Sequence, residues 1–299
     1  MAAYETALFG LAIFFLGFIL KRAGVLSEAD SKPLSKILLF AILPAVIIQA
    51  IWSARLEASL LNLFASAFAV VIPLTVLGFA FARLLKLEGP VKGSFVTAFP
   101  SLEGALIAYP AILAVFGAEG LSRFVVFDIG NALYLFTAVY AISTISGKGK
   151  FDSREIAPML AFNPLIWADA IGFALNLSGY QNATLSSFLS MAGAPLLFLV
   201  MLSFGIEFHP HLGALKLPAL SIALKTGAGL AIGVAVASLF GLTGIGRASV
   251  IVGAQLPPSI LCFVFAKEHG LDSKYLANLS SIALPIGLVV STIVAGMLA

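Results

Sequence analysis

The residue best suited to chemistry in this sequence is Glu103, which lies between Pro100 and Pro110 in a long apolar run. An ionisable group at the centre of a membrane span costs about 2.5–3.5 kcal/mol, so such residues usually have a function. A carboxyl group there can carry a proton, or it can bind a hard cation together with carbonyl oxygens. We predict that Glu103 couples to an ion and, with Ser101, contacts a substrate. The alternative is a structural Glu held by a neighbouring helix end.

A second apolar run contains the pair Pro257-Pro258, flanked by Gln255 and Ser259. Each proline removes a backbone donor and clashes with the preceding turn, so a continuous helix is not expected. Carbonyl groups freed at such a break attract cations, and the N-terminal end of the next helical piece attracts anions. Gln255, Pro257, Pro258 and Ser259 are therefore predicted to contact substrate. Hydrogen bonding between helices is the alternative.

Further polar residues stand inside other apolar runs. Asp128 and Asn131 are one helical turn apart and present polar oxygens on one face. We expect Asp128 to take part in ion coupling and Asn131 to contact substrate, unless Asp128 lies shallow enough to be hydrated. For Asp169 and Lys225 we expect a mutual ion pair, or a Lys225 side chain that reaches the inner surface.

The composition excludes a soluble protein. Of 299 residues, 61% are hydrophobic and 10% are charged, and the mean hydropathy is +1.08. Soluble domains carry about 25% charged residues. The single cysteine, Cys262, permits neither an internal disulfide nor a cysteine metal cluster. With no charged tail, a nucleic-acid partner is not expected. We predict no metal site and no cofactor, with Na⁺ or H⁺ open as a coupling ion.

Ten membrane spans are predicted to position these residues in an all-α polytopic membrane protein. They cover residues 3–20, 33–52, 58–85, 92–116, 121–146, 156–177, 185–208, 215–242, 248–267 and 275–299. The first is expected to be a retained helix, because Glu5 lies where a signal peptide would be positive. Thirteen of the 17 Lys and Arg residues fall in loops after odd-numbered spans, and three in loops after even-numbered ones. The positive-inside rule then predicts a protein of the cytoplasmic (inner) membrane with both termini on its outer side.

This orientation gives the two halves of the chain, residues 1–150 and 151–299, opposite topology. Many transporters are built from such inverted repeats, with broken helices at the binding site. Pro44 and Pro195 lie near the middle of the second and seventh spans, about half the chain apart. We therefore predict two inverted five-helix repeats whose discontinuous helices four and nine cross at their breaks.

Several short motifs resemble the auxin efflux carrier family, which includes plant auxin carriers and bacterial malonate-type carriers. The motifs are Leu43-Pro44-Ala45, Asn163-Pro164-Leu165-Ile166, Ala194-Pro195-Leu196, Ser203-Phe204-Gly205, the stretch around Pro257, and Ala266-Lys267-Glu268-His269-Gly270-Leu271-Asp272. Where the family has an N-x-G-F-x-G-x-P pattern in span four, alignment on Pro110 puts Glu103 at the Asn position and Ala105 and Ala108 at the glycines.

The resemblance implies a scaffold of helices 1, 2, 6 and 7 and a transport core of helices 3–5 and 8–10, as in the bile acid sodium symporters. It also implies a homodimer through the scaffold and organic carboxylates as substrates. An anion would bind beside Glu103 only if that carboxyl group were protonated or held a cation.

A secondary transporter of a small organic anion, working by alternating access, is thus the function that we predict. Proton coupling, sodium coupling of the bile acid type and uncoupled passage stay open. The chain contains no nucleotide-binding Gly-rich loop, so it does not use ATP by itself. An intramembrane enzyme, which would use Asp128 and Asp169, is disfavoured because neither residue stands in the sequence context of such proteases. A channel or membrane sensor is the remaining alternative.

Overall fold

The computed structural model describes residues 3–55, 57, 59–208 and 214–299, and the regular secondary structure of these residues is helical. The elements are α1 (Ala3–Arg22), α2 (Glu28–Ile37), η1 (Leu38–Ile42), α3 (Leu43–Trp52), α4 (Ser59–Leu84), α5 (Gly89–Ala98), η2 (Gly104–Ala108), α6 (Tyr109–Tyr134), η3 (Leu135–Val139), α7 (Tyr140–Lys148), η4 (Ser153–Glu155), α8 (Ile156–Ala161), α9 (Pro164–Leu177), α10 (Ala183–Gly193), α11 (Leu196–Glu207), α12 (Lys216–Leu239), α13 (Gly244–Ala254), α14 (Leu261–His269) and α15 (Ser273–Leu298).

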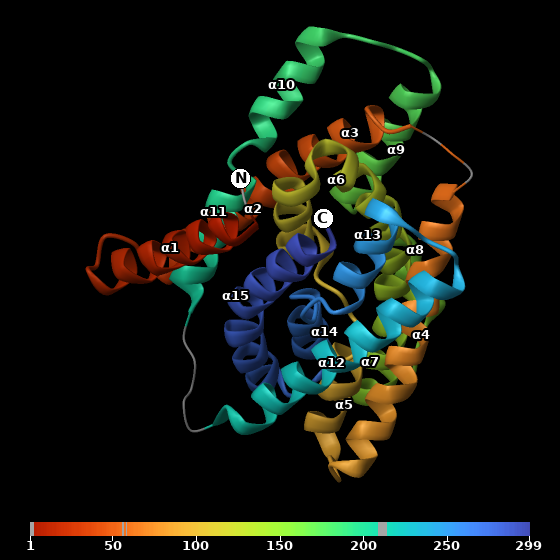
Figure 1. Ribbon diagram of the computed structural model, residues 1–299. Coiled ribbons are helices and arrows are strands. Elements are labelled where there is room, and N and C mark those ends of the chain that lie inside the picture. Colours follow the sequence, from red (N-terminus) through yellow and green to blue (C-terminus); the bar gives the residue numbers. More distant parts are fainter. Residues whose placement is uncertain (1–2, 56, 58, 209–213) are drawn as a thin grey trace.

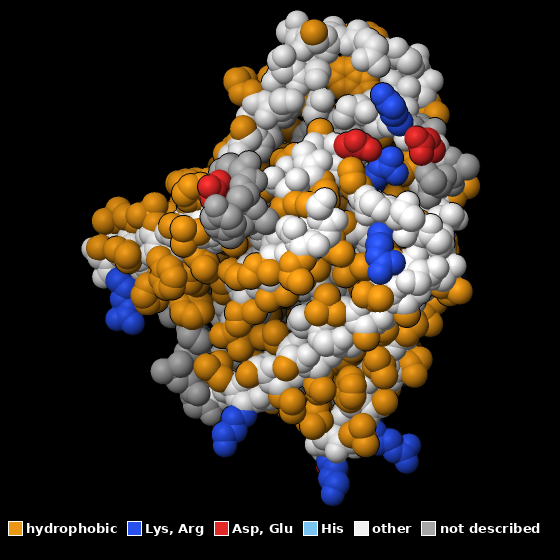
Figure 2. All heavy atoms as spheres, viewed as in Figure 1, with side chains coloured by type: hydrophobic (Ala, Val, Ile, Leu, Met, Phe, Trp, Pro, Cys, Tyr) orange, Lys and Arg blue, Asp and Glu red, His pale blue; other side chains and the backbone are white. Residues whose placement is uncertain are grey.

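The surface carries large apolar side chains that water would not favour. Phe162, Leu239 and Met297 each expose 80% or more of their surface. Figure 2 shows hydrophobic side chains over much of one face, with Lys and Arg toward its lower end and its upper right. An apolar surface rimmed by charge in this way is typical of a protein surrounded by lipid.

By length and composition, six helices of the described residues can cross a membrane, and a bent pair can supply a seventh span. The predicted count of ten is therefore not established by these criteria. Part of the difference comes from the fourth and ninth predicted spans, which are interrupted. Another part comes from α6, which bends at Gly117 (φ 65°, ψ −160°) between the fourth and fifth predicted spans. Glycine adopts this positive-φ conformation without strain from a side chain.

The helices pack in two groups. In the first, α1 lies along α11, and α3 lies beside both α9 and α10. In the second, α4 packs on α6, and α12 packs on α13, α4 and α15. The two groups meet where α15 contacts α1 and α11 and where α6 contacts α3 (Figure 1).

Two segments near the centre of the second group are not helical. The first separates α5 from η2, and the second separates α13 from α14. The second break contains Pro257-Pro258, as the sequence predicts. In the first group, α9 begins at Pro164 after Asn163, whose Oδ1 accepts a hydrogen bond from the N–H of Leu165 at 2.9 Å. The axis bends there by 59° between α8 and α9. The Asn-Pro pair thus ends one helix and starts the next in a new direction.

Close packing of α12 on α13 fixes the position of the second break. A Cβ atom at Gly229 would collide with the carbonyl oxygen of Ala254, the last residue of α13. One turn further on, a Cβ at Gly233 would lie 2.9 Å from the Cβ of Ala254. Small residues in membrane helices allow backbones to approach in this way. Gly227 differs, because a Cβ there would meet no atom within 4 Å.

We predict that Gly229→Ala destabilises the protein by about 1–3 kcal/mol, because the added methyl group overpacks the contact with α13. Thermal unfolding of the purified protein in detergent measures the effect. Gly227→Ala is the matched control on the same helix and should leave the melting temperature unchanged or slightly raised. Equal melting temperatures for the two variants would contradict this account of the α12–α13 contact.

Candidate functional site

The two breaks hold each other through hydrogen bonds donated by backbone N–H groups. The N–H of Glu103 donates a hydrogen bond to the carbonyl oxygen of Pro257 at 2.9 Å. In return, the N–H of Ser259 donates to Oγ of Ser101 at 3.1 Å. Backbone groups that lose their helical partners at a proline need new partners when they are buried. Here each break supplies partners for the other.

The Glu103 carboxylate strengthens this junction. Its Oε2 atom accepts hydrogen bonds from the N–H of Ile260 at 2.9 Å and from Oγ of Ser259 at 3.2 Å. Its Oε1 atom faces the N–H of Leu106 at 3.4 Å. These backbone donors belong to the N-terminal ends of α14 and η2, where the helix dipole favours a negative charge. The carboxylate is therefore held by helix ends, as the structural alternative expects.

Glu103 also faces a cavity of about 310 Å³. Its polar lining contains three carboxyl groups, two amides, a phenol and a hydroxyl group, which belong to Glu103, Asp128, Asp169, Asn131, Asn163, Tyr109 and Ser259. The walls are apolar and include Phe40 and Phe136. Among the described residues, no Lys, Arg or His lines this cavity. Small-molecule sites have this character, with mostly apolar walls and a few polar groups that fix orientation.

Asp128 and Asn131 connect the cavity to the first break. Nδ2 of Asn131 donates to Oδ1 of Asp128 at 2.8 Å and to the carbonyl oxygen of Leu102 at 3.1 Å. Gly104 lies against the Asp128 carboxylate so closely that a Cβ atom there would collide with it. A glycine at position 104 therefore allows the aspartate to approach the break.

The predicted site residues fall into two sets. Glu103, Asp128, Asn131 and Ser259 line the cavity. Ser101, Pro257 and Pro258 are buried within the breaks, and Gln255 points toward α15 through a hydrogen bond from Nε2 to Oγ of Ser291 at 2.7 Å. This second set builds the junction instead of lining the cavity. Contact of either set with a substrate stays a prediction.

Two charged residues behave differently from expectation. Asp169 lines the cavity, and its buried Oδ1 atom has no hydrogen-bond partner within the described chain. Lys225 is 2% exposed, and its Nζ donates to the carbonyl oxygens of Phe99 at 2.6 Å and Ser101 at 2.7 Å. The expectation of a mutual ion pair or of a snorkelling lysine is therefore wrong. Charge within an apolar run was the signal for both residues, but it does not show which neighbour a side chain faces.

A larger hollow of about 880 Å³ also reaches the junction, at Ile260. Residues of α2, α11, α14 and α15 line it, together with Ile260. Glu28, Lys32 and Glu207 stand in its lining. Ile260 thus borders this hollow, while its neighbours Ser259 and Leu261 border the smaller cavity.

Long apolar helices, two breaks that bind each other and a cavity beside them are features of a membrane carrier. The chain belongs to the membrane transport protein family, the auxin efflux carrier-like family, whose model matches residues 2–295. This membership confirms the resemblance seen in the sequence and the expectation that the protein is an integral membrane transporter and not an enzyme.

Two relatives support the same conclusion. An uncharacterized transporter of Methanothermobacter thermautotrophicus is 27% identical over 304 residues, which cover 97% of this chain and 99% of that protein. An uncharacterized transporter of Methanocaldococcus jannaschii is 24% identical over 293 residues, with 93% of each chain covered. The similarity therefore extends over nearly the full length of both relatives.

We predict that Asn131→Leu lowers stability by about 1–3 kcal/mol, because the carbonyl of Leu102 and the carboxylate of Asp128 both lose a buried donor. Thermal unfolding in detergent is again the measurement. Asn62→Leu makes the same replacement at an exposed position of α4 and serves as the control. An Asn131→Leu melting temperature equal to that of the control would show that the amide does not anchor α6 to the break.

Proposed function

We propose that this transporter moves a small organic anion together with protons across the cytoplasmic membrane by alternating access. The observation that carries the proposal is the place of Glu103. It connects the two broken segments through Ile260 and Ser259, and it lines the cavity where a cargo would bind. A proton on this carboxyl group therefore changes the charge that the cargo meets beside the junction.

The architecture that we propose has ten spans in two inverted repeats, residues 1–150 and 151–299, with both termini outside. Spans 1, 2, 6 and 7 form a scaffold, through which a homodimer assembles, and the remaining spans form the moving core. The grouping of α1, α3, α9, α10 and α11 apart from α4, α6, α12 and α13 supports this division. The occurrence of one break in each half of the chain supports the two repeats.

Electrostatics supports coupling to protons. Glu103, Asp128 and Asp169 share one cavity, and an anion would be repelled if all three were ionised. Protons that neutralise these groups remove the repulsion, so protons and anion bind better together than separately. Reciprocal linkage of this kind allows a proton gradient to drive accumulation of the anion.

A second candidate is supported by the absence of basic groups from the described cavity lining. A small organic cation would be attracted by the ionised carboxylates and would compete with protons instead of binding with them. Phe40 and Phe136 also offer aromatic faces that attract cations. In this case the carrier would exchange the cation for protons.

The direction of the pH effect separates the two candidates. Purified protein in liposomes is tested for counterflow with a panel of mono- and dicarboxylates and a panel of alkylamines. We expect exchange of a carboxylate that becomes faster as the pH falls. Exchange of an amine that becomes slower as the pH falls would favour the cation instead. Flux without counterflow would indicate a channel and contradict both proposals.

We predict that Glu103→Gln removes the response of carboxylate uptake to an imposed pH gradient while the protein stays folded. The amide keeps the shape of the carboxyl group, but it neither gains nor loses a proton at the pH values on either side of the membrane. Uptake is measured in liposomes with and without the gradient, and folding is checked by size-exclusion chromatography.

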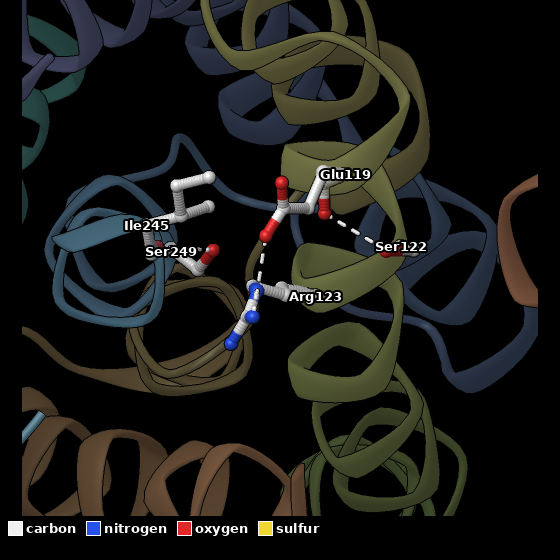
Figure 3. Close-up of polar contacts among 5 residues, drawn as sticks. All are labelled: Glu119, Ser122, Arg123, Ile245 and Ser249. Atoms are coloured by element: carbon white, nitrogen blue, oxygen red, sulfur yellow. Dashed lines mark hydrogen bonds and ion pairs between the residues drawn. The ribbon is translucent and has the colours of Figure 1, made fainter. Parts of the chain in front are cut away.

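Glu119→Gln is the matched control. Glu119 is exposed on α6 just after the bend at Gly117, and it pairs with Arg123 at 3.2 Å. Both side chains point from α6 toward the helix that carries Ser249 (Figure 3). This variant should keep the wild-type response, because the Glu119 carboxylate is exposed and does not line the cavity. Coupling through Glu103 is wrong if Glu103→Gln retains the wild-type response to pH.

A further inference from the structure

The mechanism proposed above leaves one buried charge unused, the ammonium group of Lys225. It lies on α12, which belongs to the second group of helices, and it contacts the first break. Its hydrogen bonds go to the carbonyl oxygens of Phe99 and Ser101, at 2.6 and 2.7 Å. Both carbonyls follow the last residue of α5, where carbonyl groups have no helical partners and the helix dipole is negative.

The surroundings of Nζ resemble a cation site. The ring of Phe99 lies 5.9 Å from Nζ, a separation at which an aromatic ring attracts a cation. Sγ of Cys262 donates to Oγ of Ser101 at 3.1 Å, which completes a buried polar group around the break. In carriers with broken helices, unwound carbonyls and helix C-terminal ends are the groups that coordinate Na⁺. Here the carbonyl oxygens of such a site already accept hydrogen bonds from the Lys225 side chain.

We propose that Lys225 is a tethered cation that fills an alkali-cation position at the first break, so that transport needs no Na⁺ there. This inference rests on the proposed transport function and decides its open question of sodium coupling. The ammonium takes over the charge and the hydrogen bonds that a bound ion would supply to Phe99 and Ser101. A second cation beside these carbonyls would be repelled by the first.

In Lys225→Ala the two carbonyls lose their donors, and the space of the side chain opens next to them. An alkali cation with its water can then enter, because hard cations bind oxygen ligands. Binding to the folded state alone raises the melting temperature with ion concentration. The variant should therefore acquire a dependence on Na⁺ that the wild-type protein lacks.

The test measures the melting temperature of detergent-solubilised protein in NaCl, LiCl, KCl, methylammonium chloride and choline chloride at equal ionic strength. We expect no difference among the salts for wild type. For Lys225→Ala we expect a melting temperature several degrees higher in at least one small-cation salt than in choline chloride. Lys216→Ala, the same change at an exposed position of the same helix, should behave like wild type.

Two results would overturn the proposal. One is a Lys225→Ala protein that is equally stable in all these salts. The other is a wild-type protein that is stabilised by Na⁺ or whose carboxylate uptake follows a Na⁺ gradient. If Lys225→Ala cannot be purified, Lys225→Gln takes its place, and the wild-type sodium measurements decide in either case. Because the stability measurement needs no cargo, its outcome is independent of whether the transport proposal is right.

Discussion

Every polar backbone group within the membrane must find a partner inside the protein, and the centre of this structure depends on that constraint. Pro100 and Pro257-Pro258 interrupt helices where lipid and apolar side chains offer no replacement partners. The chain meets the constraint by bringing the two interruptions together. The N–H of Glu103 donates to the carbonyl oxygen of Pro257, and the N–H of Ser259 donates to Oγ of Ser101. Neither break would be tolerated without the other.

The same constraint explains the signs of the buried charges. Helix ends that begin at the junction present N–H groups, and the Glu103 carboxylate accepts from them. The helix that ends there presents carbonyls, and the Lys225 ammonium donates to them. Each charge thus complements the dipole of the helix end that it meets. A reversed charge at either position would face a helix end of its own sign.

The sequence predicts the parts of this arrangement that depend on local chemistry. A double proline cannot continue a helix, and a glutamate in an apolar run needs donors, so the second break and the importance of Glu103 follow from the residues themselves. Which helix faces which is a tertiary property. For this reason the residues do not show that Lys225 faces the carbonyl oxygens of Phe99 and Ser101 instead of Asp169 or the surface. Nor do they show that Gln255 donates a hydrogen bond to Ser291, and its contact with a substrate stays a prediction. The number of spans is equally sensitive to tertiary structure, since a broken span fails any test based on helix length.

Alternating access requires some contacts to change while others persist. The bonds at the junction are poor candidates for change, because breaking them within the membrane would leave several polar groups without partners at once. The contact between the two groups of helices can change more easily, because apolar surfaces can slide past each other without leaving polar groups unpaired. The smaller cavity lies on this contact. Phe40 and Asn163 come from the first group, and Glu103 and Asp128 come from the second. A cargo bound there would touch both groups, so its charge and the protons on the carboxyl groups would determine which relative position of the two groups is favoured.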